Sequence, residues 1–266
     1  MIVVLLLGLT VGVILALTGA GGGILAVPLL VFGAGLSMAE AGPIGLLAVG
    51  LAATLGAVMG LKNGTVRYKA ALLTAGAGIV CSPLGLWLAQ RTPNRPLTIL
   101  FAFVLMYVAF RVYQRSLAPS TESKTPFTSK PPPCQLDVNR GKLNWTGPCA
   151  WALTFSGIIA GGLSGLLGVG GGFVMVPALQ RYTNLTPQSV LATSLAIIAL
   201  VSISGVAASS AAGHLQWAVA IPFSTGALVG MAGGRLIAAR LAGPHLQRGF
   251  AAVSIVVAVA LLVKAI

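Results

Sequence analysis

One five-residue signature, glycine, any residue and three glycines, occurs twice in this chain. The first copy covers 19–23 and is followed by Pro28; the second covers 168–172 and is followed by Pro177. The same offset of 149 positions holds without a gap well beyond the signature. Matched pairs are Gly12 with Gly161, Leu36 with Leu185, Gly56 with Gly205, Gly64 with Gly213, Gly85 with Gly234, Arg91 with Arg240, Leu97 with Leu246 and Phe101 with Phe250. The chain is therefore a duplicated unit, with a glycine break near the start of each copy.

The composition places both copies in a membrane. Hydrophobic residues make up 57% of the chain and charged residues 7%, whereas soluble domains carry about 25% charged residues. Apolar stretches of membrane-spanning length cover 43–61, 70–90, 97–110, 190–212 and 250–263. No alternating strand pattern accompanies them, so helices rather than a barrel satisfy the backbone. Residues 1–18 lack a basic leader and an obvious cleavage site, and we interpret them as a retained membrane segment.

We expect three regions in the chain. They are a first transmembrane repeat at 1–115, a flexible linker at 116–148 that is rich in Pro, Ser, Thr and Lys, and a second transmembrane repeat at 149–266. The predicted helices are 2–18, 24–34, 41–61, 69–90 and 96–114 in the first repeat, and 149–167, 173–181, 187–210, 216–239 and 245–264 in the second. The second piece of each repeat reaches only about 15 Å, half of a bilayer core of about 30 Å. The fold prediction is an all-α, polytopic membrane protein in which each repeat has a glycine-broken re-entrant hairpin and three spans.

The positions of the basic residues favour one of two topologies. If the hairpins are re-entrant, each repeat crosses the membrane an odd number of times and the second repeat is inverted. With a cytoplasmic linker, all of the 16 lysines and arginines except Arg91, Arg95 and Lys264 then lie inside. If each hairpin is one broken span, the repeats are parallel, Lys264 moves inside, and four arginines move outside: Arg181, Arg235, Arg240 and Arg248. The positive-inside rule favours the inverted arrangement, with both termini outside.

Capping signals mark the first full span of each repeat. Ser37 and Glu40 form an S-x-x-E capping box, and Thr186 precedes a proline at the equivalent place. We therefore interpret Glu40 as a helix cap rather than as a proton carrier. Pro28 and Pro177 fit either a kink within the short helix or its first turn.

The two glycine breaks are the candidate site. Gly21–Gly23 and Gly170–Gly172 have no side chains, so other groups can approach the backbone closely. The short helix after each break begins with N–H groups that lack intrahelical partners and lie at the positive end of the helix dipole. Two such ends, facing each other deep in the membrane, would bind a small anion. The competing interpretation is that the glycines only let helices pack closely.

Polar side chains near the breaks supply further candidates. Thr18 directly precedes the first break, Ser164 lies before the second, and Thr193 and Ser194 lie early in the following span. The alternative for such hydroxyls is a bond to the backbone of their own helix. Arg235 lies within an apolar run, where it either extends to the cytoplasmic surface or attracts the anion.

Other chemistries find no support in the sequence. No Asp or Glu lies mid-span, so a carboxylate proton relay is absent, and the two histidines lie at span ends. We find no catalytic residues, no metal-ligand cluster and no cofactor motif; a phosphate-binding loop would need Lys-Ser or Lys-Thr after the glycines. Cys81, Cys134 and Cys149 lack metal-ligand spacing and an evident pairing, and we interpret them as small membrane thiols. The net charge of +13 reflects topology rather than nucleic-acid binding.

These features together resemble the TauE/SafE family of sulfite exporters. The resemblance is carried by two copies of G-x-G-G-G followed by a proline, each opening a repeat around a variable central loop. It is also carried by Ala192-Thr193-Ser194-Leu195 after the second copy. It implies transport of sulfite, sulfonates such as sulfoacetate, or related sulfur oxyanions across the bacterial cytoplasmic membrane, often outward. The first repeat departs from the pattern at Pro43-Ile44-Gly45, where a Thr-Ser pair is expected, so the two breaks would not use hydroxyls symmetrically.

We therefore expect a secondary transporter, not an enzyme, that moves a small sulfur-containing anion by alternating access. The expected binding residues are Gly21, Gly22, Gly23, Gly170, Gly171, Gly172, Thr18, Thr193 and Ser194. A passive anion channel and a non-transporting membrane scaffold are the alternatives. The expected partners are the anion and the lipid bilayer of the cytoplasmic (inner) membrane, without nucleic acid. A homo-oligomer, the direction of transport and the coupling ion are left open.

Overall fold

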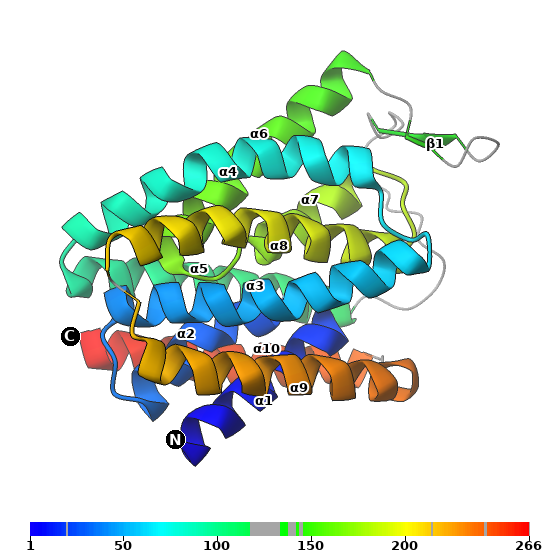
Figure 1. Ribbon diagram of the computed structural model, residues 1–266. Coiled ribbons are helices and arrows are strands. Elements are labelled where there is room, and N and C mark those ends of the chain that lie inside the picture. Colours follow the sequence, from blue (N-terminus) through cyan, green and yellow to red (C-terminus); the bar gives the residue numbers. More distant parts are fainter. Residues whose placement is uncertain are drawn as a thin grey trace.

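The computed structural model describes residues 1–19, 21–117, 134–137, 142–143, 146–213, 215–241 and 244–265. These residues form ten helices and one two-residue strand pair (Figure 1). The first repeat contains α1 (Ile2–Thr18), α2 (Gly21–Gly33), α3 (Met38–Lys62), α4 (Tyr68–Arg91) and α5 (Asn94–Leu117). Then come β1 (Leu136–Asp137) and β2 (Lys142–Leu143), which pair antiparallel. The second repeat contains α6 (Gly147–Leu167), α7 (Gly172–Tyr182), α8 (Pro187–Ala211), α9 (Trp217–Leu241) and α10 (Pro244–Ala265).

The predicted all-helical membrane fold is confirmed. Each predicted helix is present, with ends that differ from the prediction by at most three residues. The capping box of α3 forms as expected, because the Ser37 side chain accepts the Glu40 N–H and the Glu40 carboxylate accepts the Ser37 N–H. Pro28 and Pro177 lie inside α2 and α7, so neither proline starts its helix. Of the predicted linker, 118–133, 138–141 and 144–145 lie outside the described residues.

Six of the described helices are long and apolar enough to cross a membrane. They are α3, α4, α5, α6, α8 and α9. The helix that opens the second repeat, α6, is therefore long enough to cross alone, whereas α1, α2 and the described apolar part of α10 are shorter. Large apolar side chains such as Phe103, Trp151 and Leu236 are exposed on the outer surface. Lipid is the natural environment for such a surface, because hydrocarbon tails do not penalise exposed apolar groups.

The main helix contacts are the same when the two repeats are exchanged. α3 and α8 pack together in the middle of the bundle, and α5 packs against its own counterpart α10 (Figure 1). Outside the central pair, α1 packs on α9. Their counterparts, α6 and α4, also pack together. The opening helix of each repeat thus packs on the fourth helix of the other, so neither repeat is a separate bundle.

Glycines create these contacts between repeats, and they match residue by residue at the 149-position offset. The matched contacts are Gly8 on Phe223 with Gly157 on Thr74, Gly12 on Ala227 with Gly161 on Gly78, and Gly234 on Val13 with Gly85 on Gly162. For five of these six glycines a Cβ would overlap a backbone carbonyl of the partner helix, whereas a Cβ on Gly234 would lie 3.0 Å from the Val13 Cα. Close backbone approach through small residues is how membrane helices gain packing without a hydrophobic driving force. These glycines, which lie outside the breaks, therefore allow the two repeats to pack closely.

The two central helices run in opposite directions. Gly60, near the end of α3, lies against Ala192 near the start of α8, where a Cβ on the glycine would be 3.0 Å from the alanine Cβ. In the middle, a Cβ on Gly50 would lie 2.6 Å from the Cβ of Ser202. Since α3 and α8 are counterparts, this pair of equivalent helices is antiparallel.

Candidate functional site

The second glycine break is a short buried turn between α6 and α7. α6 ends at Leu167, and Gly168 caps it in the left-handed conformation with a φ of 69°. Gly170 and Gly171 follow with φ values of 76° and 65°. Three left-handed residues within four positions require glycine, because a Cβ disfavours this conformation. The local sequence therefore determines the break, as predicted.

Several backbone N–H groups at this break have no acceptor. The Gly168 N–H donates to the Ser164 carbonyl, and the Val174 and Met175 N–H groups donate to the Gly171 carbonyl. Among the described residues, the N–H groups from Val169 to Phe173 make no backbone hydrogen bond. They lie at the N-terminus of α7, where the helix dipole places partial positive charge. A buried backbone donor without a partner is uncommon, so this run can accept a ligand oxygen.

Side chains of the central helices surround this break. A Cβ on Gly170 would lie 2.9 Å from the Ile198 side chain and 3.3 Å from the Val49 side chain. These two residues belong to α8 and α3, the antiparallel pair. The glycine string thus lies against the middle of the bundle, as the hairpin prediction requires.

The first break lies beside the second. Gly19 ends α1 with a φ of 72° and packs against Leu191 of α8. Ala20 lies outside the described residues, and Gly21 already begins α2. A Cβ on Gly23 would meet the carbonyl oxygen of Val169, so the backbone of one break contacts the other. The fold therefore brings the two predicted glycine strings together.

The predicted hydroxyl groups are engaged in other bonds. The Thr18 hydroxyl donates to the Ile14 carbonyl at 2.7 Å, and the Ser194 hydroxyl donates to the Leu191 carbonyl at 2.8 Å. The Thr193 hydroxyl accepts the Arg67 N–H at 3.1 Å, which ties α8 to the loop between α3 and α4. The hydroxyls of Thr18 and Ser194 thus bond to the backbone of their own helices, which is the alternative stated above.

Other buried hydroxyls near the second break have no hydrogen-bond partner. They belong to Ser164 on α6, Ser82 on α4 and Ser202 on α8. Sequence analysis named Ser164 but missed Ser82 and Ser202. A signal was present, since the 149-position offset pairs these two serines with Met231 and Ala53, so polar residues occur in only one copy.

The predicted cation, Arg235, lies on α9 beside α3. Arg235 is half-buried, and its guanidinium lies 3.6 Å from the position of a Cβ on Gly56 of α3. Its neighbour Gly234 packs on Ala16, near the end of α1. Arg235 therefore lies on a helix that packs against the helix before the first break. Among the described residues, no His, Cys, Asp and Glu side chains gather as metal ligands.

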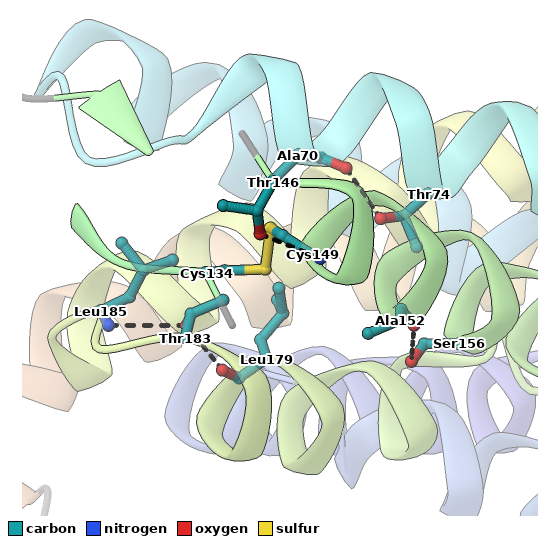
Figure 2. The surroundings of a disulfide bond; sticks show 10 residues. All are labelled: Ala70, Thr74, Cys134, Thr146, Cys149, Ala152, Ser156, Leu179, Thr183 and Leu185. Atoms are coloured by element: carbon teal, nitrogen blue, oxygen red, sulfur yellow. Dashed lines mark hydrogen bonds between the residues drawn. A yellow bond between two sulfur atoms is a disulfide. The ribbon is translucent and has the colours of Figure 1, made fainter. Parts of the chain in front are cut away.

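A disulfide bond fastens the outer end of the second hairpin. Cys134 and Cys149 are joined with their Cα atoms 5.0 Å apart, and both are fully buried (Figure 2). The Cys134 N–H also donates to the Tyr182 carbonyl at 3.1 Å, at the end of α7. The segment at Cys134 thus bridges the start of α6 and the end of α7. The interpretation of these two cysteines as unpaired thiols is wrong; Cys81 on α4 is free.

Comparison with known proteins identifies the family of this chain. The model of the family described as sulfite exporter TauE/SafE matches residues 4–261. The chain belongs to the TauE/SafE family. A probable membrane transporter protein of Xylella fastidiosa is 28% identical over 94% of this chain and 90% of its own length. The probable membrane transporter protein YunE of Bacillus subtilis is 26% identical over 86% of this chain and 85% of its own length. No solved structure matches.

Membership of the TauE/SafE family establishes the general function. The chain is a multi-pass membrane transporter and not an enzyme. Because the family match covers 4–261, both breaks and nearly all of both repeats lie within the matched region. The predicted resemblance to this family is therefore confirmed over nearly the whole chain.

Proposed function

We propose that this TauE/SafE protein is a secondary transporter that exports a small sulfur-containing anion, such as sulfite or a sulfonate, across the cytoplasmic membrane. The observation that carries the proposal is the run of unpaired N–H groups from Val169 to Phe173, buried at the N-terminus of α7. These groups are neutral donors at the positive end of a helix, which suits an oxyanion better than a cation. The sulfur preference comes from the family.

The same geometry supports alternating access around the breaks. Neither hairpin packs solely within its own repeat, because α1 lies on α9 and α6 lies on α4. A small rotation of the helices packed with α1 and α9 against those packed with α4 and α6 would therefore expose the breaks first to one side of the membrane and then to the other. The direct contact between Gly23 and the Val169 carbonyl places both breaks where such a rotation would act.

The antiparallel central helices support inverted repeats. α3 and α8 are counterparts of membrane-spanning length, and if both cross the membrane their opposite directions give the two repeats opposite orientations. The charge count then favours a cytoplasmic location for the linker side of the protein, which includes Lys62, Arg67 and Lys69.

The Cys134–Cys149 disulfide lies on this same side, although disulfides are usual on the extracytoplasmic side. In the cytoplasm such a bond would be reducible, so the charge count and the disulfide predict opposite locations for the linker side. Cysteine labelling from outside the cell distinguishes the two locations.

Cysteine labelling tests the inverted arrangement. Asn63 and Ala212 are exposed counterparts that cap α3 and α8. In a Cys81→Ser background, we expect a membrane-impermeant maleimide added to intact cells to label Ala212→Cys but not Asn63→Cys. Labelling of both from one side would contradict inversion. Labelling of Asn63→Cys alone would keep inversion but place the linker and its disulfide outside.

Flux measurements test the proposed function. In proteoliposomes we expect sulfite uptake that saturates with concentration and accelerates when the inside is preloaded with unlabelled sulfite. Counterflow of this kind requires a carrier, and its absence from a conducting protein would indicate a passive channel instead. Purified protein that moves neither sulfite nor sulfoacetate above empty liposomes would contradict the proposal.

A further inference from the structure

We propose that Ser82, Ser164 and Ser202 form, with the second glycine break, a one-sided oxyanion site in which the first break contributes no hydroxyl. The inference rests on the proposed function and specifies its binding residues. The sequence offered Ser164 as a candidate but did not include it among the expected binding residues, and it did not identify Ser82 or Ser202.

The first support is the state of the three hydroxyl groups. All three are buried, with exposed fractions of 0% for Ser82, 0% for Ser164 and 2% for Ser202. None has a hydrogen-bond partner. Hydroxyls elsewhere on the same helices, such as those of Thr74 and Ser209, donate to a carbonyl one turn back in their own helix. A buried hydroxyl without a partner loses the hydrogen bonds that it made in water, so a ligand that restores them is stabilised.

The second support is their convergence on the break from three helices. The Ser202 hydroxyl lies 3.8 Å from the position of a Cβ on Gly170. The Ser82 hydroxyl lies 3.0 Å from the position of a Cβ on Gly205, one turn beyond Ser202 on α8. Ser164 lies in the last turn of α6, where its carbonyl accepts the Gly168 N–H. The Ser202 hydroxyl thus lies beside Gly170, the Ser82 hydroxyl lies one turn further along α8, and Ser164 lies in the last turn of α6 before the break.

The third support is the asymmetry between the repeats. At the 149-position offset, Ser82, Ser164 and Ser202 correspond to three buried apolar residues: Met231, Leu15 and Ala53. Arg235 on α9, the helix that packs on α1, has Leu86 on α4 as its counterpart. The helices α4, α6 and α8 therefore carry the neutral hydroxyl donors, whereas α9 carries a positive charge.

This division predicts the class of ligand. A sulfite or sulfonate group has three acceptor oxygens, which can be shared between three hydroxyls and the backbone N–H groups. A halide has no such set of separate acceptors. We therefore expect the site to select sulfur oxyanions over chloride, with the hydroxyls providing the selectivity.

Ligand-induced thermal stabilisation of purified protein tests the site without requiring transport. Sulfite should raise the midpoint of unfolding of the wild-type protein, because a ligand that binds only the native state stabilises it. In Ser82→Ala and Ser202→Ala, we expect the sulfite concentration for half of this effect to rise by about tenfold to a hundredfold, as for a lost hydrogen bond to a charged group. Ser254→Ala is the matched control, since Ser254 is also buried and unpartnered but lies on α10.

The outcomes distinguish the site from the proposed function. Equal sulfite curves for wild type, Ser82→Ala and Ser202→Ala would overturn the site, even if the protein transports sulfite. So would no stabilisation of the wild type by sulfite, or an equal loss in Ser254→Ala. Serine-dependent stabilisation without flux would keep the site and contradict the transporter proposal. A variant that fails to fold is replaced by Ser164→Ala, read in the same way.

Discussion

Replacing Gly161 with leucine is expected to prevent stable folding, whereas the same change at the next residue, Gly162, is expected to be tolerated. A Cβ on Gly161 would overlap the backbone of Gly78, and backbone atoms cannot move aside as a side-chain tip can. Helices α6 and α4 would have to separate, and overpacking of this kind costs about 3 kcal/mol or more when the neighbours cannot yield. A Cβ on Gly162 meets nothing within 4 Å.

The two variants are compared by the yield of detergent-extracted protein on size-exclusion chromatography and by the midpoint of its thermal unfolding. Because both variants gain the same apolar side chain on the same helix, differences in helix propensity and hydrophobicity cancel. We expect little folded Gly161→Leu protein and a Gly162→Leu midpoint close to wild type. Equal midpoints would mean that close packing of α6 on α4 does not hold the two repeats together.

The second large effect is expected on transport rather than on folding. In Gly170→Val, the new side chain would approach Ile198, Val49 and the Ser202 hydroxyl, and it would cover the unpaired N–H groups. Loss of one hydrogen bond to a charged ligand costs about 1.5–3 kcal/mol. We therefore expect sulfite flux to fall by at least about tenfold, because each 1.4 kcal/mol is a factor of ten.

The control for Gly170→Val must carry the same backbone strain. Gly213 has a φ of 70°, close to the 76° of Gly170, and a Cβ there meets nothing within 4 Å. Gly213→Val should therefore pay a similar conformational cost without touching the site, and its flux should equal that of wild type. Flux in Gly170→Val as high as in Gly213→Val would remove the second break from the transport pathway.

The structure also explains why Gly170 is a better test than the other break glycines. A Cβ on Gly22 would lie 2.6 Å from the Val11 carbonyl oxygen, and one on Gly171 would lie 2.5 Å from that of Ala160. Substitution there would disturb the hairpin itself, so a loss of flux would have two explanations. The nearest neighbours of Gly170 are the ends of side chains, which can yield.

The helices could be predicted because their causes are local. Apolar length, the Ser37–Glu40 capping box and the glycine signatures act within a few residues, so the ends of α1 to α10 follow from the sequence within three residues. The duplication likewise needs only the offset of 149 positions. The location of the candidate site at the breaks came from the same local signals.

The side chains around the site could not be predicted in the same way. Ser82 lies on α4 and Ser202 on α8, and only the interlocking of the two repeats brings them to the same turn. The Cys134–Cys149 bond similarly depends on the path that returns the chain from the linker to α6. Thr193 and Ser194 were the natural candidates from the sequence, but their hydroxyls bond to backbone groups outside the breaks.

By itself, then, the sequence determined a duplicated helical membrane protein with two glycine breaks, because hydrophobic length and left-handed glycine turns are properties of short segments. The tertiary structure alone decided that α1 packs on α9 and α6 on α4, that α3 and α8 run antiparallel, and which hydroxyls are left unpaired beside Gly170. The physical reason is that small residues allow close packing at many places along a membrane helix. Which of these places meet depends on the shape of both repeats together.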